Sequence, residues 1–479
     1  MYKRQPLTLA IDQGTHASRA VIFDARAEII NSARQDIGLQ RRGDTEVEQD
    51  AGEILASVKS VINRVIAESG ADPDMIRQAG LATQRSSVVA WDRFSGQPLS
   101  PVLSWQDRRT ETQLHTYRAH LGDIEKRTGL RLSAHYGATK LKWLLEHVAS
   151  VRSAWKEGRL LMGPLAGFLL HNLVEGKPGL VDHANASRTL LWNLESREWD
   201  PDLANLFGVP MNTLPACRPT LSNYGLLQDG GIPLTAVNGD QTAAIYSLGK
   251  PDPRVLLVNT GTGAFVLIPG QRSVVHIPRL LTGISMSNGN TGDYYLEGTV
   301  NGAGAAITWA AKQWKISGVT GKLSGWLRSI DDPPVFINTI GGLGSPWWRS
   351  GKKPCLLGGD EKRPEDSGGG AMTAVVESIV FLIQSNIDYM KEREICFDSI
   401  CASGGMASVD GFCQRIASLS GYPVERPAET EATARGIAWQ ASGCPARWPA
   451  AGESTRFEPQ QNRSLRERYK LFRDSIQDR

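Results

Sequence analysis

Short apolar runs that end in polar, glycine-containing turns alternate along this chain with longer stretches of helical spacing. Leu7–Ile11 is apolar, stops at a DQGT turn and leads into the apolar run Ala20–Phe23. This order predicts a strand, a tight turn and a second strand. Gln49–Glu68 instead repeats apolar residues every three or four positions, which predicts an amphipathic helix. The alternation of strands and helices predicts an α/β protein.

The first hairpin pattern recurs near the middle of the chain. Val255–Ile268 again contains an apolar run, a glycine-containing turn and a second apolar run. Aligning Asp12 with Asn259 also aligns Gly14 with Gly261 and the threonines that follow them. We interpret this as a degenerate internal repeat, two domains of one architecture. Two unrelated hairpins are the alternative interpretation.

Both turns have the composition of an anion-binding site. Glycine lets the backbone approach a ligand, successive backbone N–H groups attract phosphate, and the Thr15 and Thr262 hydroxyls add donors. Arg19 can offset phosphate charge. Asp12 would repel phosphate unless a cation lay between them, so it is a candidate Mg²⁺ ligand. A turn-forming aspartate is the structural alternative.

Three further polar stretches follow predicted strands, where the ligand sites of α/β proteins usually form. Asp240 lies in VNGDQTAAIY, between a strand and a short helix. It is either a helix cap or a general base that the helix N-terminus keeps ionised. Gln84 and Arg85 can donate to hydroxyl groups. Trp105 either offers an apolar face to a polyol or packs in the core.

Two segments in the second half favour a nucleotide. Tyr294–Trp309 passes from a strand through small residues into a helix, and Ile400–Leu419 contains a strand, a Gly-Gly turn and a helix. Small residues let a base or ribose pack closely against the backbone. A glycine turn that opens a helix suits a nucleoside.

Composition narrows the classes of function. A chain of 479 residues exceeds one compact core, so we expect domains at residues 1–248 and 249–479. The net charge of +3 disfavours nucleic acid and anionic membranes as partners. Six cysteines without a C-x-x-C pair disfavour a disulfide framework or zinc site and favour the cytoplasm. We expect neither a signal peptide nor a membrane span, because the apolar runs are too short.

Ten stretches in one order carry a family resemblance: AIDQGTHASRAVIFD, TQRSSVVAWD, WQDRRT, TKLKW, NASRTLLWN, GDQTAAIY, NTGTGAF, YYLEGTVNGAGAAITW, GGLGSPWW and ERPAETEATARG. On these residues the chain resembles the FGGY carbohydrate kinases, and within them the glycerol kinases, from Leu7 to about Ser442. The resemblance implies two actin-like (ribonuclease H-like) ATPase domains with an interdomain active-site cleft. It also implies ATP and Mg²⁺ as cofactors, a small sugar or polyol as substrate, and a homodimer or tetramer.

The resemblance further implies roles for individual residues. Asp240 would be the catalytic base during transfer of the ATP γ-phosphate, and Asp12 the metal-associated carboxylate. The substrate-binding residues would be Gln84, Arg85, Ser86, Trp105, His135, Tyr136, Gln241 and Phe265. The nucleotide-binding residues would be Gln13, Gly14, Thr15, Arg19, Gly261, Thr262, Gly304, Thr308, Gly404, Gly405 and Met406. A non-catalytic ATP- or sugar-binding regulator on the same fold is the alternative, and an actin-like ATPase acting on proteins is a third.

Four positions depart from the pattern of glycerol kinases. Ser86 replaces a glutamate that accepts hydrogen bonds from glycerol, and His135 and Tyr136 replace Tyr and Phe. Losing a charged acceptor costs about 1.5–3 kcal/mol per bond, which is roughly tenfold or more in affinity. The smaller Ser86 therefore favours a larger polyol or sugar over glycerol. Val409 replaces an asparagine at the nucleotide end, which predicts a contact to adenine that is either looser or made by the backbone.

Overall fold

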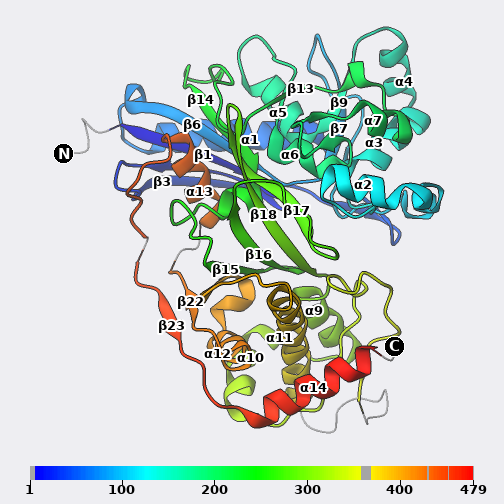
Figure 1. The fold of residues 1–479 in the computed structure, drawn as a ribbon. Helices are drawn as coiled ribbons and strands as arrows, with labels where there is room; N and C mark the ends of the chain where they lie inside the picture. Colours follow the sequence, from blue (N-terminus) through cyan, green and yellow to red (C-terminus); the bar gives the residue numbers. More distant parts are fainter. Residues whose placement is uncertain (1–5, 358–367, 429–430, 451, 478–479) are drawn as a thin grey trace.

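The computed structural model describes residues 6–357, 368–428, 431–450 and 452–477, which form two α/β lobes, one above the other in Figure 1. This confirms the predicted two-domain α/β fold. The strands of the first half are β1 (Leu7–Gln13), β2 (Ala17–Phe23), β3 (Ile29–Asp36), β4 (Gln40–Arg42), β5 (Glu46–Gln49), β6 (Ile76–Thr83), β7 (Val88–Asp92), β8 (Val102–Leu103), β9 (Leu160–Pro164), β10 (Leu180–Asp182), β11 (Trp192–Asn193), β12 (Glu198–Trp199), β13 (Ala216–Arg218) and β14 (Leu234–Gly239). Its helices are α1 (Ala51–Glu68), α2 (Leu121–Thr128), α3 (Gly137–His147), α4 (Ala149–Lys156), α5 (Leu165–Leu173), α6 (His183–Ala186), α7 (Pro201–Phe207) and α8 (Asp240–Ala244).

The second half has the same mixture of strands and helices. Its strands are β15 (Val255–Thr260), β16 (Ala264–Gln271), β17 (Leu281–Asn288), β18 (Thr291–Val300), β19 (Phe336–Ile337), β20 (Cys355–Leu356), β21 (Ser399–Gly404), β22 (Val424–Arg426) and β23 (Thr455–Phe457). Its helices are α9 (Gly304–Gln313), α10 (Val319–Ser329), α11 (Gly369–Lys391), α12 (Asp410–Ser420), α13 (Ala432–Ala441) and α14 (Arg463–Gln477).

The central sheet of the first lobe brings three chain segments to one edge. Its strand order is β14-β6-β1-β2-β3, with β6 parallel to both β1 and β14. In this register Thr83 of β6 lies opposite Gln13 of β1 and Gly239 of β14. The carboxyl ends of the three parallel strands therefore meet, so the polar residues that follow them share one edge of the sheet.

The predicted repeat is present in the sheet topology. β1 lies between the antiparallel strand β2 and the parallel strand β6, and β15 lies between antiparallel β16 and parallel β21. The turns that follow β1 and β15 consequently occupy the same place in the two sheets. The two hairpins are related parts of one architecture, and the interpretation as unrelated hairpins is wrong.

Helix α1 shows how local sequence sets an element. Asp50 caps it by accepting a hydrogen bond from the Glu53 backbone N–H at 2.9 Å. The predicted apolar face, which includes Ile54, Val58 and Val61, is fully buried. This face packs against the sheet through β2 and β3, so it fixes the sheet from one side.

Helix α13 comes from the second half but packs on the sheet of the first lobe (Figure 1). It covers β1 and β6 and lies against α8. A Cβ at Gly436 would lie 1.8 Å from the Ala243 carbonyl oxygen, so only glycine permits this approach of α13 to α8. Helix α8, which begins at Asp240, is thus packed against α13 from the C-terminal half of the chain.

Helix α11 is the helix of the described residues whose length and hydropathy match a membrane span. Its most apolar window is entirely buried inside the second lobe. It packs there against α9, α10, α12 and α14, which makes it the central core helix of that lobe.

Candidate active site

Asp240 stands at the shared edge of the first sheet, directly after β14. Its Oδ1 atom accepts a hydrogen bond from the Gln241 backbone N–H at 2.7 Å and lies 3.9 Å from Arg85 Nε. The carboxyl side chain is 27% exposed. Burial raises the pKa of Asp240, and the Arg85 charge opposes that shift. The Arg85 charge and the Gln241 N–H both favour the ionised carboxylate, but burial outweighs them and the pKa of Asp240 stays above its ordinary value.

Asp12 and Arg19 form a second charged pair at the same edge. Arg19 Nη1 lies 3.6 Å from Asp12 Oδ2 and 3.9 Å from Glu431 Oε2. Burial, together with the Asp240 charge, raises the pKa of Asp12 to about 7. The carboxylates of Asp12, Asp240 and Glu431 are thus close enough to affect one another. Sequence reasoning missed Glu431, because only folding brings α13 and its preceding residues to this edge.

Gln13 and Gln84, at this edge, form hydrogen bonds with each other and with neighbouring residues. Gln84 Nε2 donates to Gln13 Oε1 at 3.2 Å and to Gln49 Oε1 at 2.9 Å. Gln13 Nε2 in turn donates to the Gly14 carbonyl at 2.7 Å. Both amide hydrogens of Gln84 are therefore committed to protein acceptors. Gln84 was expected to donate to a substrate hydroxyl, whereas this geometry uses it to fix the first phosphate turn.

Trp105 connects the expected acceptor residues with that turn. Its Nε1–H donates to Thr15 Oγ1 at 2.9 Å, and its ring lies edge-on to His135 with centroids 5.7 Å apart. The His135 ring is also edge-on to Tyr136, at 5.0 Å. Burial and the charges of Lys140 and other cations lower the pKa of His135 well below its ordinary value, so His135 is neutral. Trp105 is partly exposed, which supports a ligand-facing ring over core packing.

Arg85 anchors the acceptor residues to the second lobe. Its Nη1 donates to the Tyr295 hydroxyl at 3.0 Å, and its Nη2 donates to Gln241 Oε1. Tyr295 belongs to β18, which pairs with β16, the strand that carries half-buried Phe265. The predicted substrate residues thus come from both lobes.

Ser86 occupies an unusual position beside Arg85. It is 2% exposed and has a left-handed backbone with φ of +64°. Its carbonyl accepts a hydrogen bond from Lys140 Nζ at 3.3 Å. Lys140 also donates to the carbonyls of Ser104 at 2.7 Å and His135 at 2.9 Å, while burial lowers its pKa to about 7. Lys140 therefore ties together three loops that carry acceptor residues, a role that sequence reasoning missed.

Arg188 is a further residue of this region that sequence reasoning missed. It is 4% exposed, its guanidinium carbon lies 5.2 Å from the centre of the Tyr136 ring, and its Nη1 lies 3.9 Å from Glu297 Oε2. The charge of Arg188 lowers the pKa of Asp240. The NASRT stretch contains Arg188. However, the distance in sequence between Arg188 and the other site residues does not predict that their side chains lie close together.

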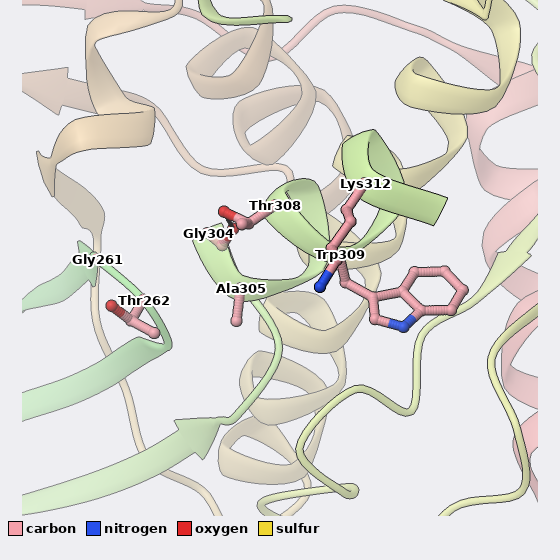
Figure 2. Close-up of a pocket in the computed structure, with 7 residues that line it drawn as sticks. All are labelled: Gly261, Thr262, Gly304, Ala305, Thr308, Trp309 and Lys312. Carbon is pink, nitrogen blue, oxygen red and sulfur yellow. Dashed lines mark hydrogen bonds between the residues drawn. The ribbon is translucent and has the colours of Figure 1, made fainter. Parts of the chain in front are cut away.

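Four of the predicted nucleotide residues, Gly261, Thr262, Gly304 and Thr308, line a cavity of about 550 Å³ in the second lobe. Figure 2 shows the Gly261–Thr262 turn facing the start of α9. Gly304 N–H donates to the Gly261 carbonyl at 3.0 Å, and a Cβ at Gly304 would lie 2.7 Å from that oxygen. The cavity is lined by Gly261, Thr262, Gly304, Ala305, Thr308, Trp309 and Lys312. Ala305, Trp309 and Lys312 were not predicted, although helical spacing from Gly304 and Thr308 places Lys312 on the same face.

The Gly-Gly turn lies beside this cavity in the sheet. Gly404 ends β21 opposite Thr260 in the parallel register, and a Cβ on it would lie 2.3 Å from the Thr260 carbonyl oxygen. Its φ is +87°, whereas Gly405 has open space around its Cβ position. Met406 follows in a short 3-10 turn and is 8% exposed.

Comparisons with known proteins agree with this arrangement. The N-terminal domain model of the FGGY family of carbohydrate kinases matches residues 7–245, and the C-terminal domain model matches residues 256–442. A glycerol kinase of Cereibacter sphaeroides is 33% identical, and the match covers 96% of each chain. A glycerol kinase of Alkalilimnicola ehrlichii is 34% identical, over 95% of this chain and 94% of that protein.

Solved structures show the same fold. A Plasmodium falciparum glycerol kinase with ADP superposes with a TM-score of 0.88 at 24% identity, covering 99% of this chain and 98% of that one. A xylulose kinase from Brucella ovis gives a TM-score of 0.85 at 18% identity, covering 98% and 99%. With both family domains matched in order and curated relatives aligned along nearly the whole chain, this protein belongs to the FGGY family of carbohydrate kinases.

Proposed function

We propose that the protein transfers the γ-phosphate of ATP to a hydroxyl group of a small sugar or polyol, with Asp240 as the general base. The observation that carries this proposal is the position of Asp240. Its carboxylate, held by the Gln241 N–H and opposed by Arg85, shares a sheet edge with the phosphate turn that begins at Gly14. The relatives named as glycerol kinases support the same reaction class.

In this reaction the acceptor oxygen attacks the γ-phosphorus while the bond from that phosphorus to the β,γ-bridging oxygen breaks. ADP leaves with the electron pair of the broken bond, and the acceptor proton passes to Asp240. Arg19, Thr15 and Thr262 are proposed to bind the phosphates, and Gly304, Thr308 and the Gly404–Met406 turn the nucleoside.

Asp12 fits a role in holding Mg²⁺. Burial and then the Asp240 and Glu431 charges raise the pKa of its carboxyl, and a nearby cation would relieve the repulsion between these carboxylates. No cluster of three or more metal-ligating side chains occurs among the described residues. Asp12, directly or through water, would therefore hold the ion together with phosphate oxygens, a common arrangement for Mg²⁺. Bound Mg²⁺ would neutralise charge on the β- and γ-phosphates.

The substitution Asp240→Asn tests the proposal. It keeps the size of the side chain but removes the proton acceptor, so acceptor-dependent ADP release is expected to fall by at least about 100-fold, while ATP binding persists. Asp36→Asn is the matched control, because Asp36 is 77% exposed and pairs only with Arg34 in the described structure. Retained turnover in Asp240→Asn would contradict the assignment of the base.

A non-catalytic regulator on the same fold is not favoured. The proposed base Asp240 lies 3.9 Å from Arg85 in the sheet edge that also carries Arg19, and the relatives named as kinases support catalysis over regulation. ADP release that rises only when an acceptor is added would separate the kinase from a regulator and from a protein-directed ATPase.

Three expectations from the sequence remain proposals. We propose a homodimer or tetramer and a cytoplasmic location, the latter because the six cysteines are sparse for this length and include no C-x-x-C pair. We also propose a domain boundary between residues 248 and 249. Helix α13 is an exception to this division, because it follows the boundary in sequence but packs on the first lobe.

A further inference from the structure

Arg188 is a buried cation with unused hydrogen-bond donors. Only 4% of it is exposed, and its Nε and Nη1 atoms have no hydrogen-bond partner among the described residues. The Nη1 atom is 3.9 Å from Glu297, which is too far for a hydrogen bond. Buried guanidinium N–H groups without an acceptor are costly, and in a folded protein such groups usually meet a ligand or water.

Ser86 is a second unpaired polar group in the same region. Its Oγ atom is buried and also has no hydrogen-bond partner among the described residues. Its left-handed backbone is uncommon for a residue with a side chain, and such strain concentrates at functional sites. Lys140 fixes the Ser86 carbonyl, so the orientation of this residue is set by the protein.

Contacts through Tyr136, His135 and Lys140 connect Arg188 with Ser86. The Arg188 guanidinium lies 5.2 Å from the centre of the Tyr136 ring, and that ring is edge-on to His135. Lys140 donates to the carbonyls of both His135 and Ser86. The Arg188 charge also reaches Asp240. The acceptor side of the site therefore combines positive charge, unused donors and a carboxylate base within electrostatic range.

We propose that the phosphate acceptor is a small polyhydroxy carboxylic acid, bound with its carboxylate toward Arg188 and Ser86 and one hydroxyl toward Asp240. This inference rests on the proposed kinase function and names its substrate class. A carboxylate supplies two acceptor oxygens and a negative charge, which match the Arg188 donors and the Ser86 hydroxyl. The transfer step is unchanged: the hydroxyl oxygen gains the phosphoryl group, its proton goes to Asp240, and ADP leaves with the electron pair.

Matched substrate pairs test this proposal. The pairs are glycerate and glycerol, erythronate and erythritol, ribonate and ribitol, and gluconate and sorbitol, which differ only in a carboxylate or a CH₂OH at one end. Coupled ADP release is measured for each at saturating ATP. Because hydrogen bonds to charged groups are worth more than neutral ones, we expect kcat/KM to be about 10- to 100-fold higher for at least one acid than for its partner.

The substitution Ser86→Glu provides an independent test. A protein carboxylate at this position would compete with the substrate carboxylate for Arg188, so the preference for the acid should fall at least about tenfold. Ser86→Gln is the size-matched neutral control and should retain the preference. Protection of the folded protein by the acid, measured as a rise in Tm without ATP, should follow the same order.

The outcomes separate this inference from the kinase function. Higher kcat/KM for neutral alditols than for their matched acids would overturn the inference and leave the kinase standing. Stabilisation by an acid without any ADP release would support acid recognition and overturn the kinase. Equal preference in Ser86→Glu and Ser86→Gln would show that the carboxylate does not bind at Arg188 and would also overturn the inference.

Discussion

The indole N–H of Trp105 donates to the hydroxyl of Thr15 at 2.9 Å. Trp105 is one of the residues proposed to bind the acceptor, whereas Thr15 lies in the turn that follows β1. One hydrogen bond thus connects the position of the acceptor with the geometry of the turn proposed to bind phosphate. An acceptor molecule that moves the Trp105 ring would therefore also change the position of the Thr15 hydroxyl.

Trp105→Phe should therefore affect ATP as well as the acceptor. An aromatic ring is kept, although phenyl is smaller than indole, but the N–H donor is lost, and one neutral hydrogen bond is worth about 0.5–1.5 kcal/mol. We expect kcat/KM for ATP to fall by roughly 2- to 10-fold, measured by coupled ADP release. The control is Trp155→Phe, because Trp155 is 43% exposed. A rise in acceptor KM alone would contradict the connection.

Gly304→Ala should impair the nucleotide cavity. The new Cβ would lie 2.7 Å from the Gly261 carbonyl oxygen, so α9 must move away from the turn. Overpacking of this kind costs about 1–3 kcal/mol, and we expect ATP affinity to fall about tenfold or more. Gly321→Ala in α10 is the matched control, because nothing lies within 4 Å of its Cβ position. Calorimetric ATP titration of both variants measures the difference, and equal affinities would refute the prediction.

Asp12→Asn should stabilise the fold while it removes activity. Folding raises the pKa of Asp12 from 3.8 to about 7, so the folded state binds the proton more tightly than the unfolded state. Stability from this group is therefore present below pH 4 and is lost as the pH rises toward 7. At pH 8, without Mg²⁺, the variant should gain about 2–4 kcal/mol in free energy of unfolding.

Denaturant unfolding at pH 4 and pH 8 checks the Asp12 prediction. The gain of Asp12→Asn over the wild type should be present at pH 8 and close to zero at pH 4. Asp36→Asn again serves as the exposed control and should show no such change. A gain that is the same at both pH values would show that Asp12 has an ordinary pKa in the folded protein.

Arg85→Met should shift the pH dependence of catalysis. Burial raises the pKa of Asp240 and the Arg85 charge lowers it, so removing that charge raises the pKa further. Asp240 must be ionised to accept a proton. The acidic limb of the pH profile should therefore move to a pH about one unit higher than in the wild type. The measurement is kcat against pH at saturating substrates. A lower kcat with an unchanged profile would mean that Arg85 acts only through Tyr295 and Gln241.

The overall architecture was predictable because its signals are local. The strand-turn-strand pattern around Asp12 and its repeat around Asn259 are visible in single stretches of sequence, and the structure places both hairpins alike. The buried face of α1 follows from helical spacing. The segments Tyr294–Trp309 and Ile400–Leu419 were predicted to suit a nucleotide because small residues and glycine turns next to strands have a recognisable composition, whereas Gly304 and Gly404 were singled out by the family resemblance.

The contacts within the acceptor region could not be predicted, because they join distant segments. Lys140 belongs to helix α3, yet its ammonium group donates to three backbone carbonyls that come from separate loops. Arg188 and Glu297 are brought together only by the packing of β18 on the first lobe. Neither spacing nor composition encodes such tertiary contacts.

The packing of α13 has a consequence for how this protein is made. The apolar strip that α13 covers includes Ala10, Ala82 and Ala243, all of which are synthesised well before α13. During synthesis this strip stays uncovered until Ala441 leaves the ribosome. The first lobe therefore cannot finish folding as an independent domain before the second half of the chain has been made. A fragment ending at residue 248 would expose the same strip and aggregate, whereas adding a peptide of residues 431–450 in trans would restore its cover.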